Sequence, residues 1–265
     1  DFVSYAYINK TTGEERTMTT IRSPAVAGLF YPADAWQLEQ DVQHLLAMAE
    51  FHDTKPKALI VPHAGYVYSG AIAATAYASL YSVAAAIRRV VVLGPAHRVA
   101  VQGLALPGVD VFDTPLGRVK LDTDLVNAIA HLPQVTVSKE AHVLEHSLEV
   151  QLPFLQKVLS DFTLLPLAVG MTSAEAVAEV LEQLWGGEET LIVISSDLSH
   201  YLPYATAQRV DSKTVQSIVQ LRQPIDHDQA CGSTAINGLI IAAQQHHLTP
   251  YLLDLRNSGD TAGSR

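Results

Sequence analysis

The sequence has very little of several features that define large classes of protein. Its 265 residues include one cysteine, Cys231, so no disulfide can form within the chain. Disulfide-stabilised secreted folds are therefore excluded. Apolar runs such as SVAAAI and LIIAA are far shorter than the roughly 20 residues that cross a membrane. The N-terminal stretch is polar with mixed charges, unlike a signal peptide. We therefore expect a cytoplasmic protein with a free thiol and no membrane partner.

Clustered basic residues and nucleotide-binding motifs are missing as well. The net charge is −10, and the pair Arg88–Arg89 is the longest run of lysine and arginine. A surface that follows nucleic-acid phosphates must be basic, so no nucleic-acid partner is expected. Neither G-x-G-x-x-G nor G-x-x-x-x-G-K-[ST] follows a predicted strand. This absence argues against the usual dinucleotide and nucleotide folds.

Short apolar strands alternate with amphipathic helices along the chain. Helical spacing is found at 35–49, 70–81, 121–132, 147–159, 173–186 and 233–247, and strand-like runs at 57–62, 88–95, 162–170, 190–197 and 249–257. This alternation predicts one α/β domain over residues 21–265, a sandwich with a central mixed or mostly parallel sheet between helices. Residues 1–20 differ in composition, and we expect them to form an N-terminal extension.

Histidines follow three of the predicted strands. His63 and His97 each lie just past one strand, and Asp197 and His200 lie at the end of a third. In open α/β sheets, ligands bind outside the carboxyl ends of the strands. Any one of these histidines could be an ordinary loop residue. Three occurrences at equivalent positions predict a functional site at this edge.

Cys231 lies just before the predicted helix at 233–247. The positive end of the helix dipole favours a thiolate there, and a thiolate is the form that binds metal or attacks as a nucleophile. A buried, inert thiol is the plain alternative. Together with His63 and His97, the thiol would give a three-ligand metal site with an open position.

The segment HVLEH (142–146) matches the inverted zinc-protease motif H-x-x-E-H and offers a rival interpretation. On a helix, His142 and His146 would share one face. Such a site needs a further carboxylate ligand downstream, yet no glutamate follows Glu189, and the candidates Glu175, Glu179 and Glu182 belong to an amphipathic helix. The protease interpretation is therefore disfavoured, although His146 could still line a pocket.

Many segments together resemble the Memo family. They are PAVAGLFYP, VPHAGYVYSG, VVLGPAHRV, FDTPLG, EHSLEVQLPFLQ, LLPLAVG, SSDLSHY, ACGSTAI and NSGDTAG, which run in order from about residue 22 to the end. That family is similar in fold to the class III extradiol ring-cleaving dioxygenases, so the resemblance implies this fold for the chain.

The resemblance also implies roles for particular residues. It implies that His63, His97 and Cys231 bind a divalent metal, Fe(II) first and copper or zinc as alternatives. The related dioxygenases use a glutamate where this chain has Cys231. His200 would be the acid–base residue, Asp197 would orient it, and His146 would be a second pocket histidine. In prokaryotes the resemblance implies a functional link to a radical-SAM protein, and in animals an adaptor role on phosphotyrosine peptides.

Three functions remain open from the sequence. The first is a non-haem iron redox enzyme of dioxygenase type, motivated by the metal trio beside Asp197 and His200. The second is a non-catalytic binding module that holds a peptide or a small anion, and the third is a metal-handling protein. The sequence identifies no particular small-molecule or peptide ligand.

Overall fold

A six-stranded sheet forms the centre of the protein in the computed structural model, which describes residues 19–263. In spatial order its strands are β2 (Ala58–Val61), β9 (Thr190–Ser195), β3 (Arg89–Pro95), β8 (Thr163–Val169), β4 (Leu104–Leu106) and β7 (Val135–Val137). Neighbouring strands are parallel except for β4 and β8, which run antiparallel. The prediction of a mixed, mostly parallel sheet is therefore confirmed.

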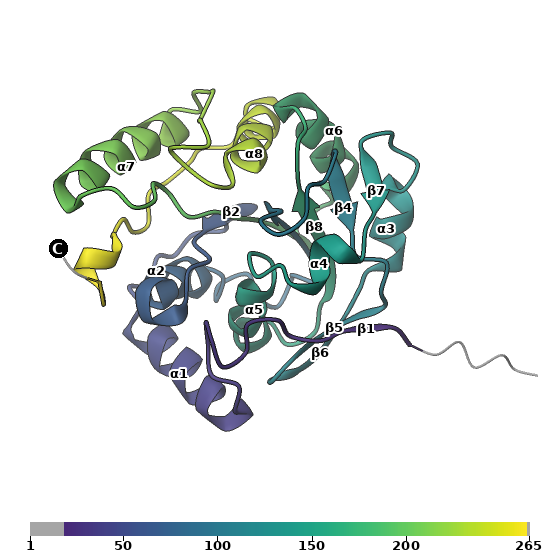
Figure 1. The fold of residues 1–265 in the computed structure, drawn as a ribbon, viewed down its shortest axis with the longest axis horizontal. Helices are drawn as coiled ribbons and strands as arrows, with labels where there is room; N and C mark the ends of the chain where they lie inside the picture. Colours follow the sequence, from purple (N-terminus) through teal and green to yellow (C-terminus); the bar gives the residue numbers. More distant parts are fainter. Residues whose placement is uncertain (1–18, 264–265) are drawn as a thin grey trace, which may run out of the picture.

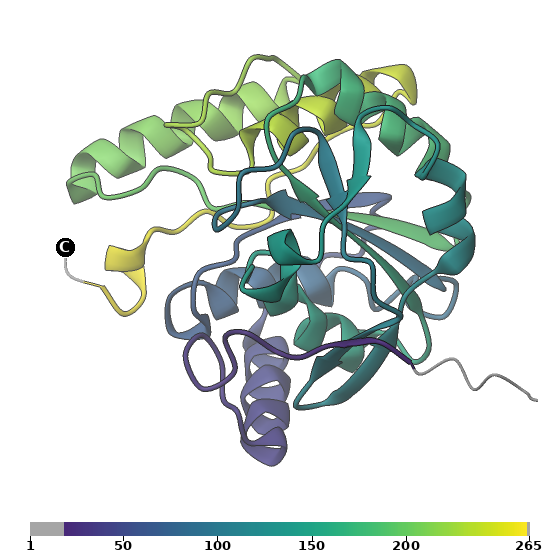
Figure 2. The ribbon, with the colours of Figure 1, turned by 45° about the vertical axis from the view of Figure 1, so that its right-hand side comes forward.

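Helices cover both faces of this sheet (Figures 1 and 2). One group comprises α1 (Ala35–Met48), α2 (Tyr66–Ala78) and α5 (Leu152–Val158), and the other comprises α3 (Thr123–Ile129), α6 (Ala174–Leu184) and α8 (Ser233–Gln245). Side chains of a strand alternate between the faces. Val90 and Val92 of β3 accordingly belong to the core under the first group, whereas Val91 and Leu93 belong to the core under the second. This burial on both faces explains why the strands are uniformly apolar.

The predicted helices are present, with shifted ends. Asp122 caps α3 and Ser173 caps α6 through their side chains, as the sequence indicates for such residues. The predicted helix at 147–159 divides into the 3₁₀ turn η1 (Glu149–Gln151) and α5, with Pro153 in the first turn of α5. Proline lacks a backbone N–H, and the first turn of a helix needs none at that position.

Several elements are not apparent from the sequence pattern. They are the long helix α7 (Tyr204–Val219), the short helix α4 (Glu140–Val143), the 3₁₀ turn η2 (Ser258–Asp260), the strands β4 and β7 of the main sheet, and a small sheet of β1 (Ile21–Arg22), β5 (Val111–Thr114) and β6 (Gly117–Lys120). The strand predicted at 249–257 is not formed, and this segment runs as irregular chain up to η2. Its apolar residues instead line a cavity beside α7.

Residues 1–18 of the expected N-terminal extension lie outside the described residues. Thr20, the residue immediately before β1, already hydrogen bonds to Asp110 through its backbone N–H at 2.7 Å and its hydroxyl at 2.9 Å. None of the helices within residues 19–263 combines the length and the apolar character that crossing a membrane requires.

A buried ion pair joins the N-terminal segment to the turn before α5. The guanidinium of Arg22 contacts the carboxylate of Glu149, and both side chains are almost fully buried. Arg22 also donates to the carbonyl oxygens of His142 and Glu145. Glu149 in turn accepts hydrogen bonds from the backbone of the N-terminal segment at Ala25. These bonds satisfy two charges that would be costly to bury alone.

Replacing Arg22 with alanine leaves the Glu149 carboxylate buried without its cation. We expect the free energy of unfolding to fall by about 3–5 kcal/mol, as for other buried pairs that lose one partner. Urea unfolding followed by circular dichroism measures this change. Arg118→Ala is the matched control because its ion pair with Asp113 is long, 4.0 Å, and exposed. The control is expected to change stability by less than about 0.5 kcal/mol. A loss below about 1 kcal/mol for Arg22→Ala, the range of exposed pairs, would contradict the prediction.

Candidate metal centre

Three adjacent parallel strands end at the site. β9 lies between β2 and β3, and the register pairs Val61 with Ser195 and Leu93 with Ile194. The chain therefore leaves all three strands at the same edge of the sheet. The first residues beyond the strands include His63 after β2, His97 after β3 and Asp197 after β9. The predicted convergence of these residues at one sheet edge is what the structure shows.

The side chain of His63 contacts Ser195, the last residue of β9. Its side chain is buried, and its Nδ1 lies 3.0 Å from the hydroxyl of Ser195. That hydroxyl gives its single proton to the carbonyl oxygen of Ser147 and accepts a hydrogen bond from Gln151. It must therefore accept from His63 as well, which assigns the proton to Nδ1. The remaining nitrogen, Nε2, faces away from Ser195 toward the site.

Asp197 fixes the loop that carries His63. Its Oδ1 accepts the backbone N–H groups of His63 at 2.7 Å and Ala64 at 3.3 Å. Its Oδ2 lies 3.8 Å from Nε2 of His63 and 4.0 Å from Nε2 of His200. The carboxylate thus stands between a buried imidazole and a more exposed one.

His97 and His146 share a single carboxylate, that of Glu145. The Nδ1 of His97 lies 2.9 Å from Glu145 Oε1, and the backbone N–H of His97 donates to Oε2 at 2.6 Å. The backbone N–H of His146 donates to Oε1 at 2.9 Å. Since an ionised carboxylate only accepts, Nδ1 of His97 carries a proton and Nε2 faces the site.

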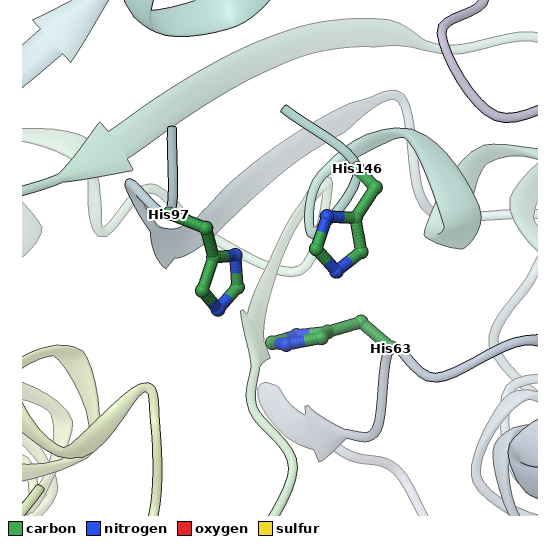
Figure 3. Close-up of side chains that lie close together, drawn as sticks. All are labelled: His63, His97 and His146. Atoms are coloured by element: carbon green, nitrogen blue, oxygen red, sulfur yellow. The ribbon is translucent and has the colours of Figure 1, made fainter. Parts of the chain in front are cut away.

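The three imidazoles converge on one space (Figure 3). The rings of His97 and His146 stack with centroids 4.8 Å apart, and His63 meets them edge-on at 5.2 and 5.4 Å. One nitrogen from each ring lies within 4.8 Å of the others. The buried Nδ1 of His146 has no hydrogen-bond partner among the described residues. Three nitrogen donors at this spacing fit a transition metal, so His63, His97 and His146 could hold one.

Cys231 lies against the same group, one residue before the N-cap Gly232 of α8, as predicted. Its Sγ is 3.3 Å from Nε2 of His63 and 3.9 Å from the hydroxyl of Ser196. The thiol therefore faces the nitrogen of His63 that the Ser195 bond leaves free. The sequence places Cys231 with His63 and His97, and the structure adds His146 as a third imidazole in the same space.

The surroundings shift the pKa values of these groups in opposite directions. Burial disfavours the thiolate of Cys231, yet the hydrogen bonds of His63 and His97 outweigh it and lower the pKa from 9.0 to about 6. Burial likewise opposes the charged form of His97, but its bonds to Cys231 and Glu145 raise the pKa to about 9. For His146, burial dominates and lowers the pKa to about 4. At neutral pH His146 is therefore a neutral donor, whereas Cys231 is a thiolate.

A cavity of about 1120 Å³ reaches Pro62 and Ala64, the two neighbours of His63 in the chain, although none of the three converging histidines lines it. Asp197 and His200 belong to its lining, and most of the remaining wall is apolar, contributed by β2, α2, α7, α8 and the segment at 248–263. His200 is 43% exposed, and the adjacent Tyr201 extends into solvent with a positive φ of 57°. A small molecule could therefore reach Asp197 and His200 from this side.

The H-x-x-E-H match does not form a helix-borne pair. α4 ends at Val143, three residues before His146. His142 points elsewhere, with Nε2 2.8 Å from the carbonyl oxygen of Ala105, and burial lowers its pKa to about 4. The motif nevertheless contains Glu145, the carboxylate that contacts His97 and His146. The sequence motif therefore included this glutamate, but its interpretation as a protease motif gave Glu145 a different role.

With this geometry in place, the comparisons define the class of protein. The family model for Memo-like proteins matches residues 22–265. A MEMO1 family protein of Aquifex aeolicus is 35% identical over 255 residues, covering 92% of this chain and 94% of the relative. A MEMO1 family protein of Archaeoglobus fulgidus is 35% identical over 263 residues, covering 91% and 94%. The chain belongs to the Memo family, and the predicted family membership is confirmed.

Because Cys231 is the only cysteine in the sequence, its titration can be measured directly on the metal-free protein. The alkylation rate with iodoacetamide, recorded against pH, is expected to reach half of its plateau near pH 6, the lowered pKa of the thiol. His63→Gln removes the imidazole that favours the thiolate, so the midpoint should move upward. A wild-type midpoint near the ordinary value of 9.0 would contradict this electrostatic description.

Proposed function

We propose that this protein binds one transition-metal ion with His63, His97 and Cys231, with His146 facing the same ion, and acts on a small molecule as a non-haem iron redox enzyme. The carrying observation is the convergence of three imidazole nitrogens within 4.8 Å, with a thiol 3.3 Å from one of them. Imidazole and thiolate together suit iron, copper or zinc. Iron is our first choice because the family resemblance connects such a site with oxygen chemistry.

The chain's own residues supply the remaining functions. A bound metal with an open coordination position would supply Lewis-acid and redox chemistry at the site. Ser195 and Glu145 keep Nε2 of His63 and His97 directed at the shared space. His200 lies on the cavity side of Asp197, where it can exchange a proton with a bound molecule, and Asp197 orients it.

The ligand set can be tested by anaerobic titration with Fe(II), and with Co(II) as a spectroscopic probe. We expect one ion per chain for the wild type. Loss of a residue that hydrogen bonds to a metal ligand typically weakens metal binding about 10–100-fold. His63→Ala and His97→Ala each remove a ligand itself, so we expect each to weaken binding by at least that factor. Cys231→Ser should abolish the thiolate-to-Co(II) charge-transfer absorption.

The exposed His131 provides the control, because His131→Gln should leave affinity unchanged. Unchanged Fe(II) affinity in Cys231→Ser would remove Cys231 from the ligand set and leave His63, His97 and His146 as the binding group. Absence of bound metal in the wild type after metal-supplemented growth would overturn the metal proposal.

The redox role requires a separate test. Iron-loaded protein is expected to take up oxygen with a phenolic substrate from a test panel, measured with an oxygen electrode. His200→Gln should lower the rate by about 10²–10⁴-fold, the usual contribution of a general acid–base group. His131→Gln is again the control. Bound metal without oxygen uptake for any compound would exclude the redox role and favour metal handling.

A binding module is the second candidate, and one observation favours it. The pKa of His97 is raised to about 9 and that of His63 is raised above its ordinary value, so the metal-free site carries cationic imidazoles next to the cavity. Such a site suits a small anion or an acidic peptide. Stoichiometric metal in protein purified without added ions would count against this alternative.

A further inference from the structure

Glu145 is a buried carboxylate directly behind the candidate metal ligands. It lies between α4 and η1 with only 1% of its surface exposed. Four N–H groups surround its two oxygens. Oε2 accepts from the backbone of His97 at 2.6 Å, and Oε1 accepts from His97 Nδ1, from the backbone of His146 and from the backbone of Ser147, each at 2.9 Å.

These bonds make Glu145 an acceptor for two different segments of the chain. His97 follows β3, whereas His146 and Ser147 belong to the turn before η1, about fifty positions further along the sequence. One oxygen, Oε1, contacts both segments. A single carboxylate thereby holds the side chain of His97 and the backbone of His146. A buried charge of this kind is tolerated because its acceptor sites are filled.

Only an acceptor fits this position. A glutamine has one oxygen and one NH₂ group, and the NH₂ group donates. With the amide oxygen at Oε1, the NH₂ group would face the backbone N–H of His97 across 2.6 Å. With the amide reversed, the NH₂ group would face the three donors at Oε1. Either orientation places donor against donor, so the isosteric amide cannot replace the carboxylate.

We propose that Glu145 is a positioning residue for the candidate metal site, holding Nδ1 of His97 in its protonated form so that Nε2 faces the ion, and anchoring the backbone of His146 beside it. The metal part of this inference rests on the proposed function. The orientation of His97 is a property of the chain alone. In this assignment the glutamate of HVLEH serves as the hydrogen-bond acceptor of two candidate ligands, in place of the role that the protease motif would give it.

The test compares Glu145→Gln with Glu145→Asp, which keeps an acceptor-only group on a shorter stem. Glu140→Gln is the control, since it makes the same change at an exposed position in α4. The first readout needs no metal. Proton–nitrogen NMR of histidine-labelled protein, assigned with His97→Gln, should show a protected, downfield Nδ1–H proton of His97 in the wild type and in Glu140→Gln. This signal should be lost in Glu145→Gln and present in Glu145→Asp.

The second readout is the affinity for Co(II) and the Co(II) absorption spectrum. Glu145→Gln is expected to bind about 10–100-fold more weakly, as when other outer-shell carboxylates are lost. Glu145→Asp should lie between it and the wild type, and Glu140→Gln should match the wild type. If Glu145→Gln fails to fold, Glu145→Asp still decides the question, because a retained Nδ1–H signal in that smaller side chain requires the carboxylate acceptor and not the native volume.

The two proposals fail separately. A His97 signal that persists in Glu145→Gln, or that is lost equally in both Glu145 variants, would overturn the positioning role. Wild-type affinity for Co(II) in Glu145→Gln would overturn it as well. A wild-type protein that binds no Co(II) would overturn the metal function, while the NMR result would still establish or refute the orientation of His97 by Glu145.

Discussion

The site depends on the parallel register of β2, β9 and β3. Hydrogen bonding across these strands pairs Val61 with Ser195 and Leu93 with Ile194, so the three chains leave the sheet at one height. A slip of one residue in any strand would displace its loop by roughly 3.3 Å and reverse every side chain. The apolar burial on both faces prevents that slip, because it ties alternate residues to separate cores. Packing far from the histidines therefore determines how closely they approach one another.

The sequence predicts this convergence of strand ends where a run of apolar residues corresponds to a buried strand. The strands around Val91 and Ile192 are uniformly apolar, and the residues that follow them are histidine and aspartate, so the edge of the sheet could be located in advance. Helix caps such as Ser173 were equally readable. The segment at 249–257 has the composition of a strand, but no described strand pairs with it, and composition alone does not reveal which edge is free.

What the sequence could not supply was long-range hydrogen bonding. The role of Ser195 follows from a count of its donors and acceptors, which requires Ser147 and Gln151 to be in place. The family resemblance named His146 as a pocket histidine, but the fit of Glu145 to two segments depends on a turn between α4 and η1 that has no regular periodicity. β1 contains two residues, too few for any pattern, and its location follows from the Arg22–Glu149 ion pair.

The three imidazoles differ electrostatically although they are adjacent. Cys231 and Glu145 favour the cationic form of His97, and Asp197, near the site-facing Nε2 of His63, favours that of His63, whereas burial keeps His146 neutral. The thiolate of Cys231 balances the resulting positive charge. A ligand that replaced protons at this site would displace them from His97 and His63 and would find the lone pairs of His146 already free. The site is therefore uneven in its affinity for protons, and its rings also differ in burial, from the buried His63 to the more exposed His97.

The distance along the chain between these groups has a consequence for biosynthesis. His63 and Cys231 touch across 168 positions of sequence. A ribosome releases the N-terminal histidines long before the thiol, and domains begin to form from the N-terminal side. The nascent chain thus carries imidazoles at the end of strands that have not yet paired with β9. The contact between His63 and Cys231 can form only after residue 231 has emerged, so it would report on nearly completed synthesis of the chain.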